Sequence, residues 1–166
     1  MSHDLYKTVE AVLPEMTALR HEFHEHPETR FKEQWTSDRI ARFLDEAGVP
    51  YVRGFARGTG IVATLEGGKQ PAGGKTVALR ADIDALEVQE ETGLPYASKT
   101  PGRMHACGHD GHTASLCGAV RALKEHQQEL AGTVKFLFQP GEEMEGGARF
   151  MVQDGAIEGV DVIFGF

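Results

Sequence analysis

The sequence predicts a three-layer α/β domain, in which helices pack on a central sheet. Helical periodicities alternate along the chain with short apolar runs bounded by Gly, Pro or polar clusters, and this alternation is typical of the α/β class. The length of 166 residues suits one domain, which would bury roughly 70% of the surface of its unfolded chain. Hydrophobic residues make up 40% of the chain and charged residues 25%, which excludes a disordered or collagen-like protein.

Two amphipathic helices are predicted in the first part of the chain. Apolar residues recur there at steps of three and four, as one face of a helix requires: Leu5, Val9, Val12, Met16, Leu19 and Phe23. Pro14 is expected to kink this helix, and Pro27 lies near its end. A second helix is predicted from about Ser37 to Glu46, with Gly48 as its stop.

Strands are predicted wherever a short apolar run is flanked by turn residues. The four runs are residues 61–65, 77–83, 134–138 and 160–166. The stretch 67–74, rich in Gly, is expected to be a surface turn. A third helix is predicted between the second and third strands, because apolar positions again follow helical spacing: Thr113, Leu116, Cys117, Val120 and Leu123.

Charge and hydropathy exclude several classes of partner. Seventeen basic and 25 acidic side chains give a net charge of −8, so a nucleic-acid partner has no electrostatic support. No window approaches the ~18 apolar residues of a membrane span. The first seven residues lack the basic and then apolar run of a signal peptide, so the cytoplasm is the expected location.

The densest group of chemically active side chains is the segment Met104–Thr113, immediately before the third predicted helix. Three histidines, a cysteine and an aspartate fall there within eight residues. Thiolate, imidazole and carboxylate are the ligands of zinc and its first-row neighbours. The alternative is a polar loop that caps the helix, with Asp110 as the N-cap. Because so many ligand types cluster, we interpret the segment as metal-binding, with Cys107 reduced and Cys117 a small core residue.

Two further groups of polar side chains follow predicted strands. Arg80, Asp82 and Asp84 would share one face of a strand at its carboxyl end, where open α/β sheets place their sites. The alternative is a solvated turn in which Arg80 pairs with an aspartate. Glu142 and Glu143 follow the next strand, and such paired carboxylates can act as general base and metal ligand. Their alternative is the acidic start of a helix.

Two other segments resemble functional motifs, but one lacks an essential residue and the other lacks the required structural context. The segment His21–His26 contains many ligand types, but Glu25 stands where the zinc-protease pattern H-E-x-x-H needs its second histidine. We interpret it as the polar end of the first helix. Residues 58–63 fit G-x-G-x-x-A, but a dinucleotide fingerprint opens a helix, and here residues 61–65 are predicted to be a strand.

Taken together, these segments resemble the amidohydrolase branch of the M20 metallopeptidase family, which includes hippurate hydrolases, N-acyl-amino-acid amidohydrolases and auxin-conjugate hydrolases. The stretch Leu19–Glu28 resembles the leading helix segment of that branch, and the three groups above match its site motifs in order. The resemblance covers the whole chain. It implies a three-layer αβα zinc-peptidase-like fold, of which residues 1–166 are the N-terminal part of the catalytic domain.

The resemblance also implies a site with two divalent metal ions, Zn, Mn, Co or Ni. By it, Cys107, His109 and Glu143 are metal ligands, Glu142 is the general base, and Asp84 supports the ligand geometry. A further histidine ligand of the branch lies about two dozen residues after the glutamate ligand, whereas the chain ends 23 residues after Glu143 (166 − 143). The lid or dimerisation domain and the C-terminal catalytic segment are then absent as well, so a fragment is expected.

The function that the resemblance implies is hydrolysis of amide bonds in N-acyl amino acids or related peptide-like substrates, by the parent enzyme. The chain alone is expected to be inactive and to self-associate through surfaces that the absent segments would cover. Two alternatives remain open. One is an inactive remnant that keeps the fold without a complete metal site, and the other is a nucleotide-binding α/β module.

Overall fold

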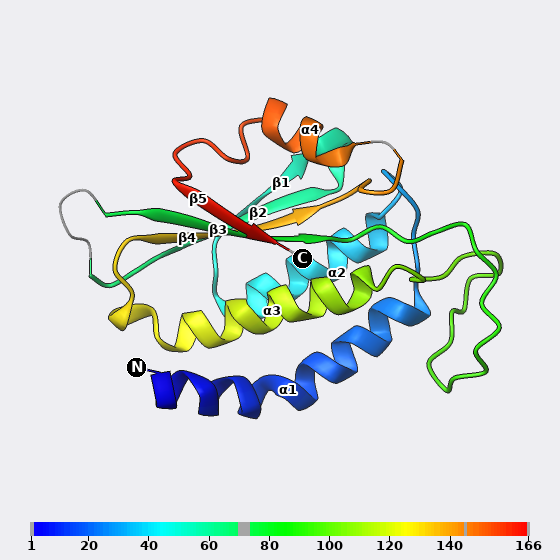
Figure 1. Cartoon of the computed structure of the whole chain (residues 1–166), viewed down its shortest axis with the longest axis horizontal. Coiled ribbons are helices and arrows are strands. Elements are labelled where there is room, and N and C mark those ends of the chain that lie inside the picture. Colours follow the sequence, from blue (N-terminus) through cyan, green and yellow to red (C-terminus); the bar gives the residue numbers. More distant parts are fainter. Residues whose placement is uncertain (1, 70–73, 145, 166) are drawn as a thin grey trace.

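The computed structural model describes residues 2–69, 74–144 and 146–165, and its centre is a five-stranded mixed sheet (Figure 1). The sheet order is β1-β2-β4-β3-β5. The strands are β1 (Tyr51–Phe55), β2 (Gly60–Glu66), β3 (Thr76–Asp82), β4 (Thr133–Gln139) and β5 (Val162–Gly165). The central strand β4 runs parallel to β3 and antiparallel to β2. At the two edges, β5 runs parallel to β3 and β1 antiparallel to β2.

Helices cover both faces of this sheet. They are α1 (Ser2–Glu25), α2 (Gln34–Ala47), α3 (His109–Glu125) and α4 (Gly147–Gln153), with short 3₁₀ turns η1 (Ala56–Gly58) and η2 (Gln127–Glu129). Figure 1 shows α1, α2 and α3 on one side of the sheet and α4 on the other. The predicted three-layer α/β architecture is therefore confirmed, with α1 packed mainly along α3.

Most predicted elements occur close to their expected positions. The runs 61–65, 77–83 and 134–138 form β2, β3 and β4, and α2 begins three residues earlier than predicted. Gly48 ends α2 with φ 63°, a left-handed conformation that glycine adopts at little cost. The last strand starts at Val162, and Phe166 lies outside the described residues, as do residues 70–73 of the expected surface turn.

The sequence patterns did not reveal β1 and α4. The three central residues of β1 are exposed, so the strand has no apolar run that would mark it. The helix α4 has only seven residues, too few to show a periodicity. Both elements border the smaller of two apolar clusters, on the face of the sheet that α4 covers: Ala56, Val62, Ala78, Leu137, Met151 and Ala156.

The main core lies between the sheet and the three helices on its other face. Its largest fully buried apolar side chains come from α1, α2, α3, β2, β4 and the residue after β3: Phe23, Ile40, Phe43, Leu44, Ile61, Leu65, Ile83, Val120, Phe136 and Phe138. Cys117 is buried in this core, as predicted. Each of these side chains contributes about 1.5–3 kcal/mol by leaving water. The core thereby fixes the ends of β3, β4 and α3 relative to one another.

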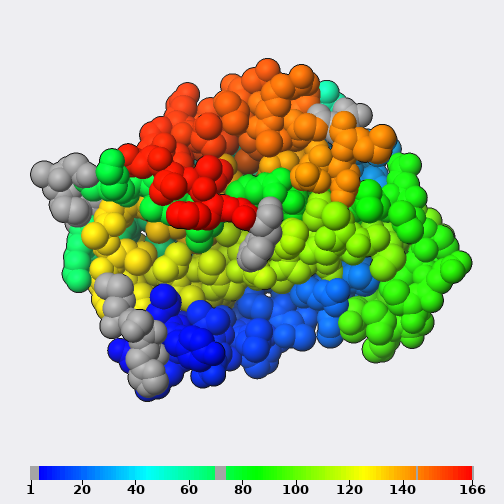
Figure 2. Space-filling view, in the orientation of Figure 1, coloured from blue at the N-terminus to red at the C-terminus, as the bar shows by residue number. Residues whose placement is uncertain are grey.

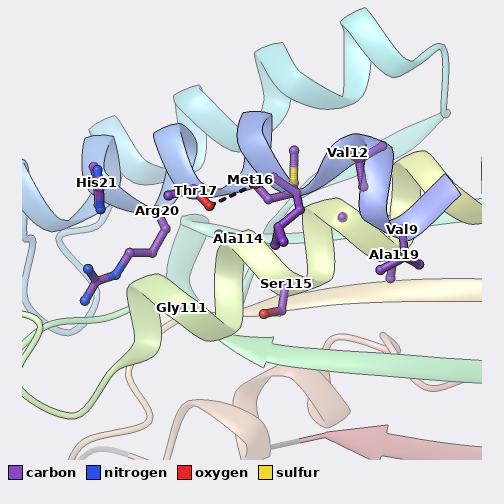
Figure 3. Close-up of a pocket in the computed structure, with 12 residues that line it drawn as sticks. Val9, Val12, Met16, Thr17, Arg20, His21, Gly111, Ala114, Ser115 and Ala119 are labelled. Carbon is purple, nitrogen blue, oxygen red and sulfur yellow. Dashed lines mark hydrogen bonds between the residues drawn. The ribbon is translucent and has the colours of Figure 1, made fainter. Parts of the chain in front are cut away.

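The apolar face predicted for the first helix is buried only in the second half of α1. Met16, Leu19 and Phe23 are buried, but Val9 is 47% exposed and Leu13 is 60% exposed. A groove of about 520 Å³ opens there between α1 and α3 (Figure 3), with small residues of α3 forming its floor: Gly111, Ala114, Ser115, Gly118 and Ala119. The helix continues through Pro14. Figure 1 shows its axis bending near the middle, in line with the predicted kink.

A second exposed apolar surface lies along β5. Val162, Ile163 and Phe164 are 42%, 48% and 59% exposed, and in the described part of the chain β5 pairs with β3 alone. Figure 2 shows α3 as a continuous exposed band between α1 and β5. These surfaces are the physical basis for the predicted self-association. Among the described helices, none is long and apolar enough to span a membrane.

Candidate metal centre

The three polar groups singled out in the sequence, one at the start of α3 and one after each of β3 and β4, meet at one edge of the sheet. The parallel strands β3 and β4 end at Asp82 and Gln139 in register, so the loops after them emerge side by side. The first turn of α3, which begins at His109, faces both loops. Glu145, two residues after Glu143 in the sequence, lies outside the described residues.

His109 is the residue around which the cluster is organised. Its Nδ1 lies 2.9 Å from the backbone oxygen of Asp84, which can only accept, so Nδ1 carries the proton. In the neutral imidazole, the Nε2 atom is then the free acceptor. It lies 3.6 Å from Asp82 Oδ2, 3.9 Å from Glu143 Oε1 and 4.0 Å from Glu142 Oε2. Atoms that ligate one ion at ~2 Å lie roughly 3–4 Å apart, so these spacings suit a shared cation.

Cys107, His109 and Glu143 each offer a ligand atom within 4.8 Å of the others. This is the trio that the family resemblance implies as ligands. A sulfur, a nitrogen and an oxygen donor together fit a borderline-soft ion such as zinc. A second trio also has its ligand atoms within 4.8 Å of one another, and it consists of Asp82, His109 and His112. The residues present therefore fit a metal, and His109 is common to both groups.

The electrostatics of the cluster favour a cation. A hydrogen bond to Glu143, burial and the charges of nearby carboxylates all raise the pKa of the Cys107 thiol. Burial lowers the pKa of His109, but Asp84 and Asp82 outweigh it and hold this pKa above its ordinary value. Negative charge therefore accumulates around these two side chains, and a bound cation would compensate it.

Asp84 lies beneath the cluster and is 1% exposed. Its Oδ1 accepts the backbone N–H of Glu142 at 3.1 Å, and its Oδ2 accepts that of Glu143 at 3.0 Å. Burial raises the pKa of Asp84, but the hydrogen bonds from His109 and these two amides outweigh burial and lower the pKa overall. An ionised Asp84 thus holds the backbone of both glutamates.

Arg80 and Asp82 form an ion pair and do not join Asp84 on one face as predicted. The strand ends at Asp82, so Asp84 lies beyond it. Arg80 Nη1 is 2.8 Å from Asp82 Oδ2, as the alternative expected, but Asp82 and Asp84 are only 3% and 1% exposed, so the segment is not the solvated turn of that alternative. The other oxygen of Asp82 accepts from His112 Nδ1 at 2.7 Å. Asp82 therefore orients His112 at the border of the cluster.

The alternative role of Asp110 as an N-cap is wrong. The N-cap position of α3 is Gly108, at φ 86° and without a side-chain cap. Asp110 is fully buried, and its Oδ2 accepts from His24 Nδ1 at 2.7 Å and pairs with Arg20 Nε at 2.8 Å. The polar end of α1 is thus partly buried. Arg20 and His24 stand four residues apart on one helix face, which is the sequence signal for this contact.

His105 belongs to neither metal group, although it lies in the ligand-rich segment. It is 4% exposed, and neither ring nitrogen has a hydrogen-bond partner among the described residues. Burial lowers the pKa of His105 to about 4. It is therefore neutral at physiological pH.

Sequence reasoning missed Glu33, which is 0% exposed. Its Oε2 accepts from Thr59 Oγ1 at 2.8 Å, and its Oε1 accepts the backbone N–H of Gly141 at 3.0 Å. Burial raises the pKa of Glu33 to about 7, although these hydrogen bonds oppose the shift. Between Lys32 and Gln34 a glutamate looks like a surface residue, so the local pattern gives no signal of its burial.

Glu33 should make stability fall as the pH rises. The folded pKa of about 7 exceeds the ordinary 4.5, so the folded protein keeps a proton that the unfolded chain releases. The stabilising contribution is full below about pH 4.5 and is lost as the pH rises through about 7. We expect Glu33→Gln to reduce the fall in unfolding free energy between pH 5 and 8 by on the order of 2 kcal/mol. Urea unfolding at four pH values measures this, and an unchanged slope would contradict it.

The two cysteines should differ in reactivity. Cys107 is exposed, whereas Cys117 is buried and burial raises the pKa of its thiol. We expect a thiol reagent to modify Cys107 in the folded protein and Cys117 only after unfolding, with added Zn²⁺ or Co²⁺ protecting Cys107. Mass spectrometry of labelled peptides identifies the sites. A native disulfide between the two, or rapid labelling of Cys117, would contradict the assignment.

Comparison with known proteins identifies relatives of this chain. Residues 78–166, more than half of it, match the sequence profile of peptidase family M20/M25/M40. The N-acetylcysteine deacetylase of Bacillus subtilis is 46% identical over 147 residues, which cover 89% of this chain and 38% of that protein. The Arabidopsis thaliana IAA-amino acid hydrolase ILR1-like 5 is 47% identical over 150 residues, covering 90% and 33%.

A solved structure agrees with these matches. The crystal structure of Bacillus subtilis YXEP protein, described as a dinuclear metal binding peptidase from the M20 family, aligns with a TM-score of 0.88 at 44% identity. The alignment covers 94% of this chain and 43% of that one. The chain therefore spans less than half the length of the relatives that it matches.

Proposed function

Because the chain belongs to peptidase family M20/M25/M40, we propose that it carries part of a metal site that hydrolyses amide bonds in N-acyl amino acids or related peptide-like compounds. The observation that supports this most strongly is the convergence of Cys107, His109 and Glu143 within 4.8 Å, with Glu142 beside them. The names of two relatives, a deacetylase of N-acetylcysteine and a hydrolase of IAA-amino acids, point to the same class of substrate.

In this proposal Cys107, His109 and Glu143 hold metal, and two ions occupy the site, as the description of the YXEP protein suggests. When bound, the ions supply Lewis-acid chemistry, a lower pKa for water and a polarised scissile carbonyl. The donor set suits zinc, manganese, cobalt and nickel alike. The hydrogen bond from His109 Nδ1 to the Asp84 backbone keeps Nε2 free to act as a ligand.

Glu142 is the proton carrier in this proposal. Its side chain is 44% exposed at the solvent side of the cluster, with Oε2 4.0 Å from His109 Nε2. A carboxylate there can take a proton from the attacking water and return it to the leaving amine. Asp84, which accepts the Glu142 backbone N–H, holds this side chain at the cluster. Asp84 acts through its neighbours and is a positioning residue.

The two alternatives have less support. The glycine pattern at residues 58–63 runs into β2, so it does not open a helix as a dinucleotide site requires. For an inactive remnant, the names of the relatives offer no support, since they describe enzymes, a deacetylase and a hydrolase. We therefore favour the hydrolase.

The test is hydrolysis of several N-acyl amino acids with added Mn²⁺, Zn²⁺ or Co²⁺. We expect the longest form of the protein that its gene encodes to hydrolyse them, and a chelator to abolish the activity. The 166-residue chain alone should be essentially inactive and should self-associate, because three ligands fix two ions poorly and the apolar surfaces along α1 and β5 are exposed. Full turnover from a monomer of this chain, or none from a metal-loaded longer form, would contradict the proposal.

A further inference from the structure

Three consecutive backbone amides in the loop after β4 are each bound by a buried carboxylate. Glu33 accepts the N–H of Gly141, and the two oxygens of Asp84 accept those of Glu142 and Glu143. The distances are 3.0, 3.1 and 3.0 Å in that order. The described residues of this loop form no helix or strand, so bonds from side chains such as these help to determine its path.

Glu33 connects this loop to two other elements. Its backbone oxygen accepts the Ser37 N–H at 2.9 Å in the first turn of α2. Its second carboxylate oxygen accepts from Thr59, which directly precedes β2. Because α2 and β2 pack in the main core, Glu33 holds Gly141 in a fixed position relative to both elements.

The residues just before Glu33 hold the same loop by packing. Gly141 has φ 60°, and a Cβ atom at this position would lie 2.7 Å from Cζ of Phe31. The backbone oxygen of Glu28 accepts the Ala85 N–H at 2.8 Å, one residue after Asp84. The segment 28–33 therefore contacts both loops that carry the candidate site.

We propose that Glu33 is a positioning residue of this site. By binding the Gly141 amide, Glu33 fixes the position of Gly141 and thereby the direction of Glu142 and Glu143. The inference rests on the proposed function, since it assigns Glu33 to the proposed metal ligand and proton carrier. If Gly141 moves, Glu143 no longer meets Cys107 and His109 at ligand distance. Outer side chains that hold metal ligands typically affect metal affinity by 10–100-fold.

Hydrogen bonding, and not negative charge, is what this role requires. A glutamine at position 33 can accept the Gly141 N–H with its oxygen and donate to Thr59 Oγ1 with its amide nitrogen. The raised pKa of Glu33, due to burial, agrees with a neutral group at this position. Alanine offers neither hydrogen bond and leaves the Gly141 N–H without its buried acceptor.

The experiment compares Glu33→Ala, Glu33→Gln and the control Glu28→Ala in the 166-residue chain. Glu28 is matched because its carboxylate binds the amides of Trp35 and Thr36 in the first turn of α2. Its contact with the site loops is made by its backbone oxygen, which the substitution to alanine leaves in place. The readouts are Co²⁺ affinity by calorimetry, the thiolate-to-Co²⁺ absorption band, and hydrogen exchange of the amides of Gly141, Glu142 and Glu143 measured by NMR.

We expect Glu33→Ala to weaken Co²⁺ binding roughly 10–100-fold and to speed exchange of the three amides relative to those of β2. The Co²⁺ affinity of the Glu33→Gln variant should stay within about threefold of that of the wild type. Glu28→Ala should lower stability without changing Co²⁺ affinity. Equal affinity in Glu33→Ala and the wild type, equal losses in Glu33→Ala and Glu28→Ala, or a Gln variant as weak as the Ala variant would each overturn the proposal.

A replacement variant and a readout that needs no metal allow the proposal to be tested in every case. If Glu33→Ala fails to fold, Glu33→Asp replaces it, since aspartate keeps the charge but is one methylene too short to reach Gly141, and the same losses are expected. The exchange measurement needs no metal. A wild-type chain that binds no Co²⁺ would therefore count against the proposed function, whereas unchanged exchange in the Ala or Asp variant would overturn the role of Glu33.

Discussion

Replacing Glu142 with glutamine should lower turnover by roughly 10²–10⁴-fold and leave metal content unchanged. The amide cannot take a proton from water or return one to the leaving amine. The Glu142 side chain is 44% exposed and lies outside the Cys107–His109–Glu143 trio, so the trio should persist. The measurement is kcat for N-acyl amino acids in the longest form that the gene encodes, together with metal analysis of the same samples.

Glu143→Gln is the matched control, because it makes the same chemical change one residue further on. Its side chain is 24% exposed, and Oε1 lies 3.9 Å from His109 Nε2. Here metal occupancy should fall, because an amide is a weaker ligand than a carboxylate. If metal content fell with the Glu142 variant and not with the Glu143 variant, the two roles would be reversed.

Asp84→Asn should cost about 3–4 kcal/mol of unfolding free energy, the largest stability effect that we expect from one substitution at the site. The two carboxylate oxygens of Asp84 each accept a backbone amide, and His109 Nδ1 lies 3.3 Å from Oδ1. Asparagine offers one oxygen, and its amide group would face an N–H donor. One buried donor is then left unbonded, and a buried charge-assisted contact is lost.

Urea unfolding of the metal-free chain measures this loss, and Asp38→Asn is the control. Asp38 pairs with Arg53 at the surface and its side chain is 50% exposed, so its replacement should change stability by less than about 1 kcal/mol. An Asp84→Asn variant as stable as the Asp38 variant would show that Asp84 does not hold the loop after β4.

The architecture and the grouping of the site residues were predictable from the sequence. The three central strands carry mostly apolar residues bounded by polar or turn residues, so β2, β3 and β4 were identified within one residue at each end. The polar groups after β3 and β4 were expected at one edge because parallel strands end together. The strand β1 escaped detection because it lies at the edge of the sheet with exposed side chains.

The supporting contacts of the site were not predictable. Glu33 is buried because α2, β2 and the loop after β4 converge on it. None of these contacts can be recognised from the residues next to Glu33 in the sequence. The pairing of His24 with Asp110 joins positions 86 residues apart. Local pattern indicates which residues carry chemistry, but the buried polar partners depend on how distant segments pack.

The late position of β4 in the chain has a consequence for biosynthesis. The strand that joins the antiparallel β1–β2 pair to β3 begins at Thr133, so residues 83–132 must be made between the end of β3 and its first partner. At roughly 5–20 residues per second the ribosome needs about 3–10 s for this stretch. During that time the nascent chain exposes β3 as an unpaired apolar strand, and chaperones that bind extended apolar segments have this interval in which to act.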